Sequence, residues 1–155
     1  MRRISAVVLA LGIVLTLVGC DKQLSQPQTD GAQPKYDWGL SLSVKNVTPT
    51  GATLVISQSN GTPSGELRYG LAYKIQYLNG ETWEDLPYAT EADVAWTEEA
   101  YIVEMDADCE VELSWDWLYG NLTSGQYRIV KQFMDFRSSG DYDNENYYAN
   151  FEIEK

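Results

Sequence analysis

Apolar and polar residues alternate with a period of two along several separated stretches of this chain. Residues 109–116 read CEVELSWD, so that every second side chain is apolar. Such alternation turns one face of an extended segment toward a core and the other toward water, which is typical of antiparallel sheet. No amphipathic helix longer than a turn or two is indicated. About seven strands are expected, within residues 40–44, 52–56, 71–77, 101–105, 109–116, 127–133 and 147–154.

Turn-forming residues separate these stretches at the spacing of a β-sandwich. The clearest hairpin is KIQYLNGETWEDL, residues 74–86, in which Asn79 and Gly80 are expected to take the positive φ values of a type I′ turn. The sequence therefore predicts an all-β fold, an antiparallel β-sandwich, with a closed eight-stranded barrel as the alternative. The other turn signals are Thr48–Gly51, Asn60–Pro63, Ser124-Gly125 and Ser139-Gly140.

One charged residue interrupts the pattern. Lys131 shares its parity with the apolar Tyr127, Ile129 and Phe133. We expect it to lie at the open end of its strand, or the strand to carry a β-bulge at this position.

The N-terminus has the features of an export signal. Arg2 and Arg3 precede an uncharged apolar run that ends at Gly19-Cys20, and such a run enters the membrane while its basic flank stays inside. The ending Leu17-Val18-Gly19-Cys20 resembles the lipobox of bacterial lipoproteins. That resemblance implies a diacylglycerol on Cys20, cleavage after Gly19, and two or three acyl chains that hold the protein on the membrane.

An uncleaved N-terminal anchor is the alternative, since the apolar run is only slightly shorter than the ~20 residues that span a bilayer. Both interpretations place the rest of the chain on the extracytoplasmic face of a cell membrane. After the signal, residues 20–36 are rich in Gln, Ser, Thr, Asp, Gly and Pro, a composition typical of a disordered tether. The expected organisation is thus a signal peptide at 1–19, a tether at 20–36 and one folded domain at 37–155.

The net charge of the chain limits the classes of molecule that it is expected to bind. Removing residues 1–19 takes away two of the 11 basic residues and leaves all 23 acidic ones, so the net charge falls from −12 to 9 − 23 = −14. A protein this acidic is repelled by nucleic acid and by anionic lipid headgroups. We therefore expect no nucleic-acid partner.

The chain contains no histidine, which excludes Ser-His-Asp and Cys-His catalysis and the usual histidine-bearing zinc sites. With Cys20 assigned to lipid, Cys109 has no disulfide partner and is expected to pack as a small apolar residue. Two carboxylate pairs, Glu110 with Glu112 and Asp106 with Asp108, have the spacing of water-facing residues that aid solubility. We expect no enzyme, no catalytic residue and no cofactor.

Two other groups of residues suggest ligands. Asp141–Asn146 places oxygen ligands at alternate positions, but it lacks the glycine and the distant glutamate of an EF-hand. A solvated acidic loop is favoured there over a weak calcium site, and no metal ligand is assigned. Trp83 in the hairpin and Trp96 in an expected loop are candidate surface platforms for sugar rings, whereas Trp115, and Trp117 if the strand continues, are expected to point inward.

A family resemblance lies in the last third of the chain. Leu122-Thr123-Ser124-Gly125-Gln126-Tyr127 resembles the tyrosine corner of Greek-key sandwiches, in which the tyrosine hydroxyl bonds to a backbone group upstream. Together with VKNVTPTGATLVIS at 44–57 and the Trp115–Lys131 block, it resembles the bacterial Ig-like domains of exported proteins of Gram-positive bacteria over about residues 38–155. The resemblance implies an Ig-like β-sandwich that acts as a surface or binding module, with no general enzymatic role.

The function expected from these observations is protein interaction or adhesion at the cell envelope by a single lipid-anchored Ig-like domain. Its partners would be the membrane, through the lipid, and another envelope protein. One alternative is a carbohydrate-binding module that contacts cell-wall glycan through Trp83 and Trp96. The other is a proteinase-inhibitor-like sandwich that presents a loop around Pro87–Thr97. Neither the partner nor the type of envelope follows from the sequence.

Overall fold

The computed structural model describes residues 34–91 and 93–155. The predicted signal peptide, the predicted lipobox with Cys20 and most of the predicted tether lie outside the described residues. None of the helices within the described ranges is long and apolar enough to cross a membrane. Those ranges contain one helix and nine strands: β1 (Leu40–Thr48), β2 (Gly51–Gln58), β3 (Glu66–Tyr69), β4 (Lys74–Asn79), β5 (Thr82–Asp85), β6 (Tyr101–Ile102), β7 (Asp108–Ser114), α1 (Asp116–Tyr119), β8 (Gly125–Ser138) and β9 (Asp141–Ile153).

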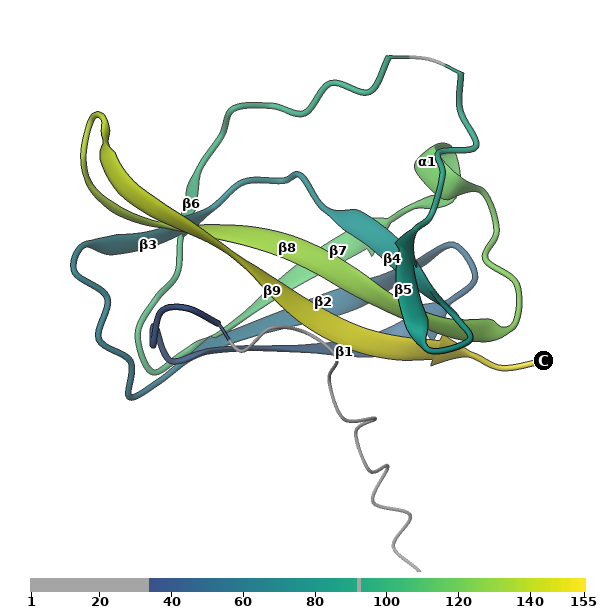
Figure 1. Ribbon diagram of the computed structural model, residues 1–155, viewed down its shortest axis with the longest axis horizontal. Coiled ribbons are helices and arrows are strands. Elements are labelled where there is room, and N and C mark those ends of the chain that lie inside the picture. The colour runs from purple at the N-terminus through teal and green to yellow at the C-terminus, as the bar shows by residue number, and fades with distance from the viewer. Residues whose placement is uncertain (1–33, 92) are drawn as a thin grey trace, which may run out of the picture. The chain divides into compact units, whose positions relative to one another are not determined.

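The strands form two antiparallel sheets, which confirms the predicted β-sandwich. Sheet A has the order β1-β2-β7. Sheet B is built around the long strand β8, which pairs with β9 on one side and with β4 and then β3 on the other, while β5 and β6 extend the sheet outward. In Figure 1, β8 and β9 cross in front of the three strands of sheet A.

The core lies between the two sheets and follows the predicted parity. Leu54 and Ile56 of β2 and Leu113 of β7 are buried from sheet A, and Ile129 and Phe133 of β8 are buried from sheet B. Burying an aliphatic or aromatic side chain of this size contributes about 1.5–3 kcal/mol, so these alternating positions supply much of the driving force for folding.

The corner between the sheets is the predicted tyrosine corner. The Tyr127 hydroxyl donates a hydrogen bond to the carbonyl of Thr123 at 2.9 Å, and its ring stacks on Phe151. Trp115 is fully buried beside it, with its indole nitrogen donating to the Pro49 carbonyl at 2.9 Å. The inward prediction for Trp115 is therefore confirmed.

Three boundaries differ from those expected. The strand predicted within 71–77 begins only at Lys74, and residues 66–69 form a separate strand, β3. The segment expected at 101–105 is a strand only at Tyr101–Ile102, because a turn around Asp106, at φ 57°, carries the chain toward sheet A. β9 begins at Asp141, six residues before the alternating stretch that was recognised.

The β4–β5 hairpin forms with a turn of the other mirror type. Asn79 pairs with Thr82, so the two turn residues are Gly80 and Glu81. Of these only Gly80 has a positive φ, at 65°, which matches the type II′ pattern with glycine first. The expectation of positive φ at both Asn79 and Gly80 is wrong because Asn79 is the last residue of the strand.

Candidate interaction surface

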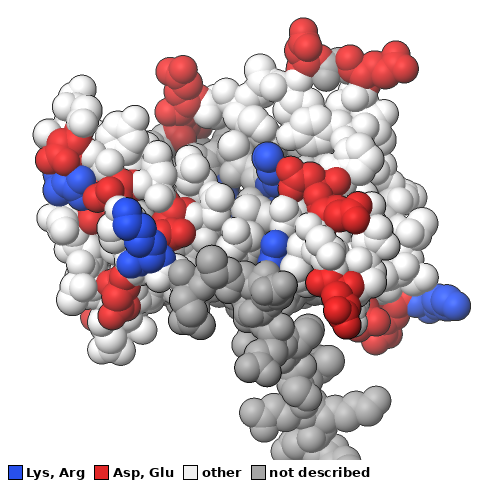
Figure 2. Space-filling view, viewed as in Figure 1, with Lys and Arg blue, Asp and Glu red and all other residues white. Residues whose placement is uncertain are grey.

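The outer face of sheet B carries apolar side chains, although it points away from the core. On β8, the residues from Arg128 to Phe136 that alternate with the core positions belong to this face. Figure 2 views this side of the molecule: uncharged surface extends between separate groups of acidic and basic side chains. Tyr142 and Ile102 are 46% and 55% exposed. The half-buried members are Leu78, Trp83, Val130, Met134, Phe136 and Tyr148. We call these eight residues the sheet-B face.

Arg128 lies at the centre of one half of this face and is held between two aromatic rings. Its guanidinium carbon lies 4.6 Å from the ring centroid of Trp83 and 4.4 Å from that of Tyr148. Its Nε donates to the Gln76 side chain at 2.7 Å. Because the rings and the amide cover it, Arg128 is only 7% exposed on a sheet face that points to solvent. Cation–π contacts of this kind gain strength when they are desolvated.

The other half of the face repeats the arrangement on a smaller scale. The guanidinium of Arg68 on β3 lies 3.9 Å from the ring centroid of Phe136 and forms an ion pair with Glu66. Arg68 also stands beside Ile102 of β6 in the sheet register. Two stacks of arginine on aromatic rings therefore lie on this face, and interface cores favour this mixture of aromatic residues and arginine.

The outer face of sheet A is polar in comparison. Ser41, Ser43 and Lys45 of β1 are exposed there, as are Glu110 and Glu112 of β7. Lys45 forms an ion pair with Glu110 at 2.5 Å, and both side chains remain about half exposed. This face is therefore a solvated surface with little to gain from burial against a partner.

Lys131 has a structural position that the sequence only partly predicts. It lies in the middle of β8, fully buried, and its amine donates to the carbonyls of Gly70 and Ala72, the latter at 3.0 Å. Between the Tyr69 and Lys74 pairings, the chain has four residues opposite two of β8. These four residues connect β3 to β4, and β8 keeps a regular register with β9 through Lys131. The expectations of an open strand end and of a bulge in this strand are therefore both wrong.

Burial also changes the chemistry of this amine. Removal from water lowers the pKa of Lys131 to about 8. Its Nζ lies 5.4 Å from the ring centroid of Tyr69, and Tyr69 in turn contacts the Cys109 sulfur at 3.1 Å. Both contacts serve packing, because the amine is used to satisfy carbonyls of the connection between β3 and β4.

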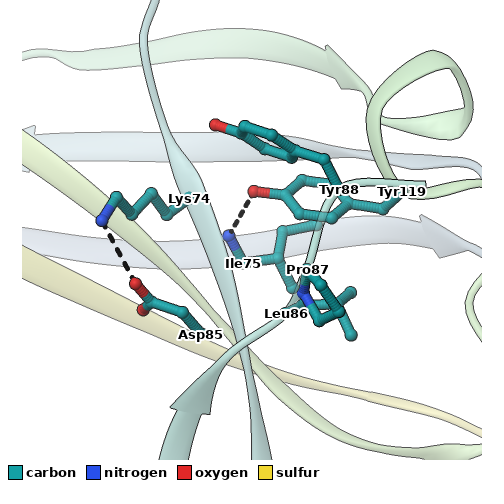
Figure 3. Close-up of a pocket in the computed structure, with 7 residues that line it drawn as sticks. All are labelled: Lys74, Ile75, Asp85, Leu86, Pro87, Tyr88 and Tyr119. Carbon is teal, nitrogen blue, oxygen red and sulfur yellow. Dashed lines mark hydrogen bonds and ion pairs between the residues drawn. The ribbon is translucent and has the colours of Figure 1, made fainter. Parts of the chain in front are cut away.

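A small pocket opens beside the hairpin (Figure 3). Lys74 and Asp85 point toward each other at one side, 3.2 Å apart, and the rings of Tyr88 and Tyr119 lie together at the other. The pocket measures about 210 Å³, which is below the usual range for small-molecule sites. The Tyr119 hydroxyl accepts a hydrogen bond from the Ile75 amide, and burial raises the pKa of Tyr119 to about 12. It therefore satisfies the edge of β4 as a neutral phenol.

The two tryptophans predicted as sugar platforms are both half-buried and do not form a platform. Trp83 packs on Arg128, and Trp96 packs on Tyr73 with ring centroids 5.3 Å apart. Trp117 was expected to continue the inward parity of β7, and this is wrong: α1 begins at Asp116, rotates the indole outward and leaves it 51% exposed. Trp117 meets Trp96 edge-on at 64°, so the two rings are not coplanar.

The loop that suggested a proteinase inhibitor runs between β5 and β6. Residues 86–91 and 93–100 form no strand, and Figure 1 shows this segment arching away from the sheets. Its start is held by hydrogen bonds from the Leu86 amide to Ile75 and from the Ala89 amide to Leu118. The inhibitor function stays a prediction.

The acidic segment Asp141–Asn146 is part of β9 rather than a loop. Arg137 forms ion pairs with Asp141 at 2.8 Å and with Asp143 at 3.0 Å. The Tyr36 hydroxyl donates to Asp143, and this bond together with Arg137 lowers the pKa of the Asp143 carboxyl. These carboxylates are thus used to tie Tyr36 and the β8–β9 turn together. Among the described residues, no three acidic, cysteine or histidine side chains are grouped as metal ligands would be.

The remaining candidate residues lie on or near β7. Glu110 and Glu112 project from the outer face of sheet A, with Glu112 accepting from the Thr53 hydroxyl at 2.7 Å and Asp108 from Ser57 at 2.6 Å. Asp106 lies in the turn before the strand. Cys109 is half-buried, and Tyr69 contacts its sulfur.

Sequence reasoning missed Arg128, Arg68 and Tyr148. The outward parity of Arg128 on its strand is visible in the sequence, but its aromatic neighbours come from β5 and β9. An arginine between two aromatics can be recognised only once the order of the strands is known.

Comparison with known proteins assigns the fold to a family. The profile of a family described as bacterial Ig-like domain matches residues 36–152. No curated protein and no solved structure matches the chain significantly.

Proposed function

Because the chain belongs to the family of bacterial Ig-like domains, we propose that it is a lipid-anchored module that binds another protein on the extracytoplasmic side of a bacterial membrane. Domains of this family serve interaction and adhesion and are typically not catalytic.

The observation that carries the proposal is the sheet-B face. Stable interfaces bury a desolvated core of aromatic, aliphatic and arginine side chains within a polar rim. The sheet-B face has this composition, with Arg128 already stacked on Trp83 and Tyr148 before any partner binds. Side chains that are ordered in advance lose less entropy on binding. Groups of acidic and basic side chains beside the uncharged surface supply the polar rim (Figure 2).

The anchor rests on the N-terminal sequence. Basic residues, an apolar run and Leu17-Val18-Gly19-Cys20 occur in the order of a lipoprotein signal. A tether over residues 20–36 would span a few tens of ångströms at most, enough to hold a domain clear of the headgroups. An anchored domain meets its partner within a layer next to the membrane, which raises the effective concentration of weak binders.

Lipidation is tested by growth with an alkyne-tagged fatty acid followed by membrane fractionation. The natural chain should carry the tag and stay with the membranes, and Cys20→Ala should carry none and leave them. The same cleavage product and the same membrane retention in Cys20→Ala would contradict the anchor.

The binding face is tested by two matched valines. Val130 on sheet B and Val55 on sheet A both lie half-buried on outer faces. In the native host, chemical crosslinking of the full anchored chain should give one discrete adduct that Val130→Asp abolishes and Val55→Asp preserves, with both variants checked for folding by thermal unfolding. Loss of the adduct with Val55→Asp, or with neither variant, would assign the contact to another surface.

A carbohydrate-binding module is the second candidate because Trp117 is exposed, as sugar-stacking residues must be. Its edge-on contact with Trp96 leaves only a single ring available. Retention of the full chain on purified wall glycan, lost in Trp117→Ala, would favour this candidate over the protein partner.

A further inference from the structure

Sheet A has two edge strands, β1 and β7, which differ in their regularity and in their charge. At the β1 edge, the ladder is interrupted between Lys45 and Thr48, where Asn46 takes a φ of 53°. Such a bulge disfavours further pairing at this end of β1, while the ladder is regular from Leu40 to Lys45. At the other edge, β7 has seven residues and pairs only with β2 within the described part of the chain.

The register shows which backbone groups of β7 face the open side. The Trp115 amide donates to the Thr50 carbonyl, which extends the β2–β7 ladder by one hydrogen-bonded pair. In an antiparallel ladder such pairs alternate with pairs whose amides and carbonyls point away from the partner strand. The amides and carbonyls of Asp108, Glu110 and Glu112 therefore point outward.

Ser114 supports this assignment, because it is the next alternate residue after Glu112 and its carbonyl should also point away from β2. Its carbonyl accepts hydrogen bonds from the Tyr73 hydroxyl at 3.0 Å and from the Trp117 indole at 2.9 Å, and both groups lie outside sheet A. For Asp108, Glu110 and Glu112, no hydrogen bond to the backbone from any described segment other than β2 is present.

The side chains along this edge indicate the chemistry of an added strand. Asp108, Glu110 and Glu112 share the outer face and are exposed. Only Glu110 has a described cation within ion-pair distance, Lys45. The surrounding sequence adds to this excess of negative charge, since residues 75–127 contain 13 acidic residues and no lysine or arginine. On the other side of the strand, Cys109 and Val111 remain half-buried.

We propose that the β7 edge binds an extended, basic segment of a partner protein, in which lysine or arginine alternates with aliphatic residues, as an additional strand of sheet A. The outward amides and carbonyls of β7 pair with that strand. Its basic side chains lie opposite Asp108, Glu110 and Glu112, where cross-strand charge pairs stabilise a sheet. Its aliphatic side chains cover Cys109 and Val111.

The same charges disfavour a second copy of this chain as the occupant. Two β7 edges would bring their carboxylates together across the new ladder, and like charges placed opposite each other destabilise it. This site is separate from the sheet-B face, so one domain could contact a folded partner and a basic strand at once.

The probe is a synthetic peptide of about eight residues, the length of an ordinary strand, in which lysine and valine alternate. The full chain is purified in a neutral detergent, and amide hydrogen exchange is followed by NMR. The amides of Glu110 and Glu112 should exchange about tenfold more slowly with the peptide present. A peptide alternating glutamate and valine should have no effect.

A matched pair of double variants distinguishes charge pairs between the peptide and β7 from the general attraction of a basic peptide to an acidic domain. Glu110→Gln with Glu112→Gln should weaken peptide binding about fivefold, from the loss of two cross-strand charge pairs. Glu152→Gln with Glu154→Gln makes the same change in net charge on β9 and just beyond it, and should change binding less than about twofold. Glu112→Pro removes one outward amide without breaking the β2 ladder and should also abolish the protection.

Three results would overturn the proposal: equal weakening by both double variants, protection of β5 or β6 amides in place of β7, or self-association of the chain through β7. None of these results affects the Val130 and Val55 test of the sheet-B face. The proposed β7 site and the proposed sheet-B face can therefore be refuted independently.

Discussion

The two sheets of this domain differ in whether they bury basic side chains. Sheet A holds Lys45 in water, half exposed beside a glutamate. Sheet B buries Arg128 between two rings on its outer face and Lys131 on its inner face. A buried cation is tolerated only where rings, carbonyls or amides replace its lost hydration. Sheet B therefore contains two buried cations that sheet A lacks. Its outer face also carries the aromatic and aliphatic side chains of the sheet-B face, where the outer face of sheet A is mainly polar.

The largest expected effect comes from taking apart the arginine stack. Arg128→Ala removes two cation–π contacts and a charged hydrogen bond and should lower the free energy of unfolding by about 2–3 kcal/mol in a urea titration. Arg128→Lys should recover less than half, since an ammonium cannot stack as a guanidinium does. An unchanged urea midpoint in Arg128→Ala would show that the arginine stack does not stabilise sheet B, and would contradict this comparison of the two sheets.

The next effect is a pH dependence from Lys131. Its pKa is lowered by burial to about 8 from an ordinary 10.5, so between these values the unfolded chain holds more protons than the folded one. Stability attributable to this residue should therefore rise with pH, by about 2 kcal/mol between pH 7 and pH 10.

The measurement is the difference in unfolding free energy between the natural chain and Lys131→Met across that range, which cancels the contribution of the tyrosines. A flat difference would show that the amine is hydrated in the folded state.

A smaller effect tests the corner that leads from sheet A into sheet B. Tyr127→Phe deletes the hydroxyl that donates to the Thr123 carbonyl and keeps the ring. The loss should be about 1 kcal/mol, typical of one hydrogen bond. Chemical denaturation of this variant beside Tyr142→Phe, which lies on the exposed end of β9, gives the comparison, and equal losses in the two variants would contradict the account.

The smallest effect belongs to sheet A. Lys45→Gln breaks the exposed pair with Glu110 and should change stability by less than about 0.5 kcal/mol, with the difference vanishing in 1 M salt. A loss as large as that from Arg128→Ala would mean that sheet A depends on its cation as much as sheet B does.

Much of this architecture follows from the sequence because it depends on local patterns. Alternation located the inward positions Leu113, Trp115 and Ile129, and the Leu122–Tyr127 segment identified the corner. The parity rule failed at Trp117, because it assumes that a strand continues, and here a single helical turn follows Ser114 at once.

The candidate surface was less accessible to sequence reasoning because it depends on contacts between distant strands. Arg128 is covered by rings from β5 and β9, and the carbonyls that hold Lys131 come from the connection between β3 and β4. The sequence predicts Asp143 as a loop residue, because the pattern of residues does not show that Arg137 and Tyr36 contact its carboxylate.

The central claim, that sheet B provides the binding face, is tested most directly by site-specific photo-crosslinking in the native host. A photoreactive residue at Val130 should give a protein adduct of one discrete mass, and the same residue at Val55, equally half-buried on sheet A, should give none. Adducts from Val55 alone, or of equal yield from both positions, would contradict it.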